Sequence, residues 1–336
     1  LSNLKAFVQQ KYHEVLKSIF VILFKQYINF GKLILIYFFI ILKCYLYQLK
    51  RRVKMEISFD CIPCLLKQAV SASRMATNDK NIQEKIIFES LDILSKYNDY
   101  CCSPDLARDI HSAVKKHTKV EDPYNEIKQR DIKSAKSVYP ALKEFLDQKN
   151  NELYWALKIS ATGNIIDSAI SNFIDIKGCA LAEAEKDFGV CDIKDFEEKI
   201  KNAKTILILG DNSGETVFDK VLIENLAPKN VVYAVRGEPI LNDATMSEAI
   251  QSGLDECATI ISSGCDSPGT ILDRCNSEFV ELFYNADVVI SKGQGNFESL
   301  SSCDREVYFL LKAKCGMVAE LLEVNVNDYV FKMHTA

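Results

Sequence analysis

The chain has 336 residues, of which 48% are hydrophobic and 26% charged, a composition typical of a soluble enzyme with a sizeable core. Its formal net charge of -5 hides an uneven distribution, because residues 1–54 hold ten Lys or Arg and one acid and so carry +9. The remaining residues therefore carry -14, and a body this acidic argues against a nucleic-acid partner.

Residues 1–54 differ from the rest of the chain in composition. They are rich in Lys, Ile, Leu, Phe and Tyr, and their longest clean apolar run, LILIYFFIIL, has ten residues between Lys32 and Lys43. A membrane-spanning helix needs about 20 residues, and no cleavage site follows the run. Two interpretations stay open: an amphipathic or anchoring extension, or translated sequence upstream of a true start at Met55. We treat 1–54 as an atypical extension outside the fold and expect no membrane association.

Residues 55–200 are predicted to form a helical domain. Four segments carry apolar residues at intervals of three and four: CIPCLLKQAVSASRMA, IQEKIIFESLDILSKY, SPDLARDIHSAVKKH and IKSAKSVYPALKEFLDQ. Ser103 followed by Pro104 is typical of a helix start. A further amphipathic segment, DIKDFEEKIKNA, leads into the second half.

Twelve cysteines occur without the spacing of a disulfide framework, which favours reduced thiols and a cytoplasmic protein. Cys61 and Cys64 bracket a proline at a predicted helix start, where the helix dipole should lower a thiol pKa. Structural thiols and a metal or redox role both stay open. A zinc site would need about two more ligands, and only Cys101 and Cys102 are plausible donors.

Residues 201–336 are predicted to form an α/β domain. Four short β-branched runs, TILILGD, NVVYAVRG, CATIISSG and ADVVISKG, alternate with helical stretches. Strands that alternate with helices indicate a mainly parallel sheet with right-handed crossovers. Ligands of such sheets bind at the carboxyl ends of the strands.

Polar residues concentrate at three of these strand ends. They are Asp211, Asn212 and Glu215 after the first strand, Arg236 and Asp243 after the second, and Lys292, Gln294 and Asn296 after the fourth. Carboxylate and amide oxygens are ligands of hard divalent ions, and Arg and Lys beside them suit an anionic substrate such as a phosphate. Each motif alone could be a turn or a helix cap, but three of them on one sheet edge favour a metal and phosphate site.

Together, GDNSGE, RGEPILNDAT and SKGQGNFESL resemble the DUF89 family of damage-control phosphatases, in particular the subfamily with a KGQGN motif. ATGNIIDSAI resembles a further family motif around Asn164 and Asp167, and DCIPC resembles the amino-terminal signature of that subfamily. The resemblance covers residues 55 to about 325. It implies a helical domain packed on a Rossmann-like, three-layer α/β domain, with the site between them.

The resemblance also implies a metal-dependent phosphatase acting on small phosphate esters, either sugar phosphates or damaged phosphometabolites. The metal, Mn²⁺, Mg²⁺, Co²⁺ or Ni²⁺, would be held by Asp211, Asn212 and Asp243. Asn164, Arg236, Lys292, Gln294 and Asn296 would bind substrate. The ion would polarise a phosphoryl oxygen and activate a water for attack, with Asp167 or Glu215 as the base. Asp211 and Lys292 are predicted to be catalytic as well.

Two other functions remain possible from the sequence. LGDNSG superficially resembles the cofactor loop of an S-adenosylmethionine-dependent carboxyl methyltransferase, although it lacks the G-x-G-x-G spacing of such loops. A non-catalytic protein that binds phosphorylated metabolites is the second alternative. Metal-dependent phosphate release separates both from the phosphatase.

Overall fold

The computed structural model describes residues 55–163 and 175–334, and Lys54–Ala336 form one compact unit. The predicted extension at 1–54 and the predicted site residues Asn164 and Asp167 lie outside the described residues. Among the helices that are described, none combines the length and the apolar character needed to cross a membrane.

Three helices form an amino-terminal bundle: α3 (Cys61–Ala76), α4 (Lys80–Ser95) and α5 (Ser103–Thr118). Their apolar faces meet in two small clusters, one around Leu65, Leu94 and Ile110 and the other around Ile86 and Val114. α5 begins at Ser103 with Pro104 in its first turn, as predicted. Arg274 of the α/β part donates to Asp105 Oδ1 of α5 at 3.0 Å, and this contact ties the bundle to the loops beside the sheet.

The rest of the described chain alternates helices and strands. In chain order they are α6 (Asn125–Asp147), α7 (Glu152–Thr162), α9 (Ile176–Ala184), β1 (Phe188–Cys191), α10 (Ile193–Asn202), β2 (Thr205–Leu209), α11 (Thr216–Asn225), β3 (Asn230–Val235), α12 (Met246–Gln251), β4 (Thr259–Ser262), α13 (Ser277–Asn285), β5 (Val288–Lys292), α14 (Gln294–Leu300), β6 (Val307–Lys312), α15 (Gly316–Leu322) and β7 (Tyr329–His334).

The strands form one seven-stranded sheet in the order β1-β7-β6-β5-β2-β3-β4. All neighbouring strands are parallel except β6 and β7, which are antiparallel. β2 is an interior strand, with β3 on one side and β5 on the other. The chain order reverses direction at this point of the sheet, and ligands of open α/β sheets bind at the carboxyl ends of the strands beside such a reversal.

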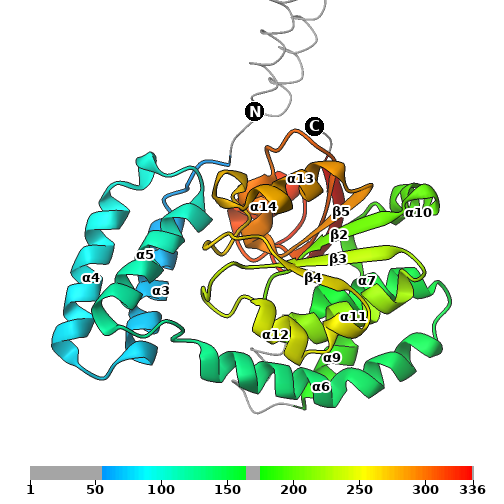
Figure 1. The fold of residues 1–336 in the computed structure, drawn as a ribbon, viewed down its shortest axis with the longest axis horizontal. Coiled ribbons are helices and arrows are strands. Elements are labelled where there is room, and N and C mark those ends of the chain that lie inside the picture. The colour runs from blue at the N-terminus through cyan, green and yellow to red at the C-terminus, as the bar shows by residue number, and fades with distance from the viewer. Residues whose placement is uncertain (1–54, 164–174, 335–336) are drawn as a thin grey trace, which may run out of the picture. The chain divides into compact units, whose positions relative to one another are not determined.

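Helices cover both faces of the sheet (Figure 1). Alternate residues of β2 point to opposite faces, so that Ile206 and Ile208 join one core while Leu207 and Leu209 join the other. The first core contains residues of α6, α7, α9, α10, α11 and α12, and the second contains residues of α13, α14 and α15. Because both faces are buried, the central strands read as continuous apolar runs.

The predicted fold class is confirmed: a helical amino-terminal part accompanies a three-layer, Rossmann-like α/β part. The structure differs from the predicted division near residue 200. β1 and the helices α6, α7 and α9 precede that residue, yet they belong to the sheet and its covering layers. The reason is that a helix packed on a sheet and a helix packed on other helices show the same apolar period.

Candidate active site

The carboxyl ends of β2, β3 and β5 bring the three predicted motifs together. Asn212 and Asp243 form an isolated antiparallel bridge between the segments that follow β2 and β3. Two backbone bonds fix it: Ser213 N–H donates to Asn242 O at 2.8 Å, and Ala244 N–H donates to Asp211 O at 2.8 Å. The backbone therefore sets the spacing between the Asp211 and Asp243 side chains.

Asp211 is buried, with 7% of its surface exposed. The loop after β5 lies directly against its carboxylate, because a Cβ added to Gly293 would stand 2.0 Å from Asp211 Oδ2. Gly293 also has a φ of 81°, which favours glycine. Glycine is therefore required at the first glycine position of KGQGN for two reasons: its backbone conformation and the close approach of the neighbouring acid.

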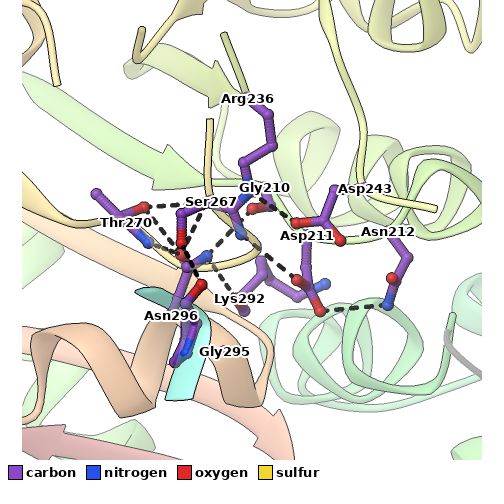
Figure 2. Close-up of polar contacts among 12 residues, drawn as sticks. Gly210, Asp211, Asn212, Arg236, Asp243, Ser267, Thr270, Lys292, Gly295 and Asn296 are labelled. Atoms are coloured by element: carbon purple, nitrogen blue, oxygen red, sulfur yellow. Dashed lines mark hydrogen bonds and ion pairs between the residues drawn. The ribbon is translucent and has the colours of Figure 1, made fainter. Parts of the chain in front are cut away.

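Arg236, at the end of β3, lies between two acids (Figure 2). Its Nε donates to Asp243 Oδ2 at 2.7 Å, and its Nη1 donates to Asn296 Oδ1 at 3.0 Å and to Thr270 Oγ1 at 3.2 Å. Its Nη2 stands 3.6 Å from Asp211 Oδ1 and has no hydrogen-bond partner among the described residues, although it is buried. We call Arg236, Asp211 and Asp243 the arginine cluster.

Lys292, at the end of β5, is only 1% exposed and makes three hydrogen bonds. Its Nζ donates to Asp219 Oδ1 at 2.6 Å, to Ser160 O at 3.0 Å and to Glu215 Oε2 at 3.1 Å. An ammonium has three protons, so these bonds use its full donor capacity. We call Lys292, Glu215 and Asp219 the lysine cluster.

Asp219, which lies in α11 and is fully buried, was not predicted from the sequence. It accepts from Ser160 Oγ at 2.6 Å and from the Tyr233 hydroxyl at 2.7 Å as well as from Lys292. A signal was present, because Asp219 follows Glu215 by four residues and so lies on the same face of a helix. Thr270 was also missed, and its loop offers no such pattern.

The remaining predicted residues have different surroundings. Asn296 is buried and donates to Gly210 O at 3.1 Å and to Lys292 O at 2.8 Å, which joins the loops after β2 and β5. Gln294 instead donates to Glu298 and accepts from Lys314 N–H, both at 2.8 Å. The amide nitrogen of Asn212 faces the acids, 2.7 Å from Glu215 Oε1 and 3.2 Å from Asp211 Oδ2.

Burial shifts the ionisation of this site. Burial and the nearby Asp243 carboxylate raise the pKa of Asp211 to about 7, against the opposing influence of Arg236. Burial also raises the pKa of Asp243 and of Glu215, although Arg236 and Lys292, respectively, act in the other direction. Burial alone would lower the pKa of Lys292, but the Asp219 and Glu215 carboxylates outweigh it and raise that pKa.

Together the two clusters hold four buried carboxylates and two buried cations, which leaves a formal excess of two negative charges. An uncompensated charge is costly to bury. The excess equals the charge of one divalent cation. Within residues 55–163 and 175–334, no group of three or more His, Cys, Asp and Glu side chains is arranged to hold a metal ion. A metal here would therefore depend on Asn212 as well as on the acids.

Asn212 fits that requirement. Its amide nitrogen, which carries a partial positive charge, lies where the carboxylates of Asp211 and Glu215 converge. A half-turn of the amide exchanges its nitrogen for its oxygen at nearly the same position. The donor set of Asp211, Asp243 and Asn212 is then all oxygen, as hard divalent ions prefer.

The prediction for Cys61 was wrong. Cys61 does lie in the first turn of α3, but burial raises its pKa instead of the dipole lowering it. Cys101 and Cys102, the proposed partners for a zinc site, belong to a separate apolar cluster with Cys265.

Comparison with known proteins shows which family this architecture belongs to. Residues 57–330 match the family described as the damage-control phosphatase ARMT1-like domain. The chain belongs to this family. It is 34% identical over 276 residues to a damage-control phosphatase of Pyrococcus horikoshii, covering 80% of this chain and 95% of that protein. It is 32% identical over 292 residues to a damage-control phosphatase of Archaeoglobus fulgidus, covering 83% and 99%.

A solved structure agrees with this assignment. The crystal structure of a DUF89 family protein from Pyrococcus horikoshii matches this chain with a TM-score of 0.77 at 30% sequence identity, covering 84% of this chain and all of the other. The family predicted from the motifs and the phosphatase function predicted with it are therefore confirmed for this damage-control phosphatase family member. The predicted cytoplasmic location stays a prediction.

Proposed function

We propose that this chain is a divalent-metal-dependent phosphatase for small phosphate esters, either sugar phosphates or damaged phosphometabolites. The observation that carries the proposal is the excess of two buried negative charges at the carboxyl edge of the sheet. A bound divalent ion would cancel that excess. It would also polarise the phosphoryl group and activate water for attack.

Residues of the chain would bind the metal ion and the phosphate. Asp211, Asp243 and Asn212 would hold the ion, any of Mn²⁺, Mg²⁺, Co²⁺ or Ni²⁺. Arg236 is held by Asp243, and its Nη2, which has no hydrogen-bond partner in the described structure, is the donor best placed to meet a phosphate oxygen. An arginine suits this task because it remains charged when buried.

Lys292 and Glu215 have a different part in this proposal. Because Lys292 already makes three hydrogen bonds, it acts on substrate only if one of them breaks. We assign it first to orienting Glu215 and keeping it ionised, and Glu215 then serves as the base that accepts a proton from water. Asp167 remains the other candidate for the base. Asn164 and Asn296 were predicted to bind substrate, and Asn296 supports the loops around it.

The test compares two matched substitutions, Asp211→Asn and Asp147→Asn. Asp147 is an exposed aspartate at the end of α6 and serves as the control. Each metal-free protein receives one divalent metal at a time, and phosphate release from p-nitrophenyl phosphate and then from sugar phosphates is followed. We expect metal-dependent release in the wild type and in Asp147→Asn, and a loss of at least about 10²-fold in Asp211→Asn. Equal rates with and without metal in the wild type would refute the proposal.

A further inference from the structure

The turn that carries Asp243 has an unusual backbone. Leu241 has a φ of 47°, in the left-handed region. Asp243 N–H donates to Ile240 O at 3.1 Å, so residues 240–243 form a tight turn with Leu241 at its second position. Leu241 is the only residue with an apolar side chain among the five non-glycine residues of the described structure that have positive φ. A leucine is disfavoured there, since its Cβ crowds the backbone and it can form no local hydrogen bond.

This turn sets the geometry of the candidate metal site. Asn242 O accepts from Ser213 N–H at 2.8 Å, which locks the turn to the loop after β2. The Asp243 carboxylate holds Arg236 Nε at 2.7 Å. A change in φ at Leu241 would therefore move a predicted ligand and the partner of Arg236 together.

The side chain of Leu241 contacts the cluster of apolar residues formed by the amino-terminal bundle and Tyr124. It is half-buried and packs against the cluster of Ala72 in α3, Ile86 in α4, Val114 in α5 and Tyr124. Strained backbone persists only where the surrounding structure over-determines it. The bundle offers such a constraint, because withdrawing Leu241 would expose apolar surface on both sides.

We propose that Leu241 is a positioning residue, whose contact with the bundle cluster holds the turn in the strained conformation that presents Asp243 to the metal. This inference rests on the proposed function for the role of Asp243. It gives the bundle a part in the site, although no bundle side chain belongs to either charge cluster. The edge of the sheet supplies the side chains of the site, and the bundle fixes the turn that carries Asp243.

The test uses the difference between alanine and glycine. Leu241→Ala and Leu241→Gly both lose the contact with the bundle, but only alanine retains a Cβ that disfavours positive φ. We expect Leu241→Ala to raise the calorimetric Kd for Mn²⁺ about tenfold, the size of the backbone penalty. Leu241→Gly should raise it less, and Leu241→Asn should follow glycine because asparagine tolerates this conformation. A purely structural contact would make glycine at least as harmful as alanine.

Two further measurements separate this inference from the proposed function. Hydrogen exchange of residues 237–246 in the metal-free proteins should be faster in Leu241→Ala than in Leu241→Gly, whether or not a metal binds. On the bundle side, Ile86→Ala should weaken Mn²⁺ binding, whereas Leu94→Ala, on the same helix but in the other cluster, should not. Wild-type exchange and affinity in Leu241→Ala, or a larger effect in glycine than in alanine, would overturn the inference. Absence of Mn²⁺ binding in the wild type would instead refute the proposed function.

Discussion

The arginine cluster and the lysine cluster meet at one edge of the sheet and have the same formal charge, yet they are satisfied to different degrees. Lys292 donates all three of its protons at 2.6 to 3.1 Å, and Asp219 receives two further hydroxyl hydrogen bonds. In the arginine cluster, Arg236 Nη2 lacks a hydrogen-bond partner in the described structure and stands 3.6 Å from Asp211 Oδ1.

From this difference we infer which cluster binds a ligand. Buried polar groups in proteins are nearly always hydrogen-bonded, so an exception needs an explanation. The lysine cluster needs no such explanation, because Lys292 is fully hydrogen-bonded. We assign this cluster to holding α7, α11 and β5 together around Glu215. The arginine cluster has spare donor capacity and two acids whose pKa burial raises, and these features favour a site completed by a metal and an anion.

The largest expected effect comes from breaking the arginine cluster. Asp243→Ala removes a predicted metal ligand and the partner of Arg236 Nε, so phosphatase activity should fall by about 10²- to 10³-fold or more. The rise in melting temperature that Mn²⁺ gives the wild type should shrink, because metal binding stabilises only the folded state. Initial rates and thermal unfolding with and without Mn²⁺ measure both. Retained activity would mean that Asp243 serves only as the partner of Arg236.

Breaking the lysine cluster should lower stability as well as the activity that depends on Glu215. Lys292→Met leaves Glu215 and Asp219 buried without their cation, and losing one partner of a buried ion pair costs about 3 to 5 kcal/mol. Denaturant unfolding measures the change. If the two clusters have the roles assigned here, saturating Mn²⁺ will not restore this loss, and full restoration would show that the clusters share one ion.

His111 of α5 is a buried ionisable group outside both clusters, and its titration should make the stability of the protein depend on pH. Burial, with the nearby Lys115, lowers the pKa of His111 to about 4. Asp122 and Tyr124 line the same cavity as His111 and Lys115. His111 takes up a proton near pH 6.5 in the unfolded chain and near pH 4 in the folded chain, so its own contribution should lower the free energy of unfolding by about 3 kcal/mol as pH falls between these values.

His111→Gln should remove that part of the pH dependence and leave metal binding at pH 8 unchanged. Denaturant melts at half-unit intervals from pH 4 to pH 8 give the slope. The carboxylates of Asp211, Asp243 and Glu215 have raised pKa values, so they stabilise the fold as pH falls over this range. The same slope in the variant would therefore assign the acid sensitivity to groups outside both clusters.

The smallest expected effect belongs to Thr270, which touches the arginine cluster without carrying charge. Its hydroxyl accepts from Arg236 Nη1 and donates to Asn296 Oδ1 at 2.8 Å. Thr270→Val keeps the shape and should cost about 1 kcal/mol of stability, the net value of a hydrogen bond. Urea unfolding measures it. A loss as large as that of Lys292→Met would mean that the roles of the two clusters are reversed, so that the arginine cluster stabilises the fold and the lysine cluster binds the ligand.

Much of the fold was predictable because local patterns and tertiary structure agree. The run CIPCLLKQAVSASRMA coincides with α3, and four β-branched runs contain β2, β3, β4 and β5. β1, β6 and β7 were not predicted. β1 has only four residues, one of them glycine. β6 and β7 form an antiparallel pair, which an alternation of strands and helices does not predict.

The site was predictable to the extent that its residues follow strands. Asp211, Arg236 and Lys292 come together because parallel strands end at one edge of the sheet. Among the partners of Lys292, Ser160 was not predictable, since it approaches from a helix that is distant in sequence, whereas the four-residue spacing from Glu215 offered a signal for Asp219. The strained Leu241 was also hidden, because a leucine gives no signal of positive φ. The roles of Asn164 and Asp167 stay predictions.

We infer that a divalent ion binds the arginine cluster and not the lysine cluster. The most direct measurement is calorimetric titration of Mn²⁺ into the metal-free wild type, Asp243→Asn and Asp219→Asn, which make the same chemical change in the two clusters. We expect one Mn²⁺ per chain in the wild type and in Asp219→Asn, and an affinity at least about tenfold weaker in Asp243→Asn. Equal weakening in both variants, or wild-type affinity in Asp243→Asn, would contradict it.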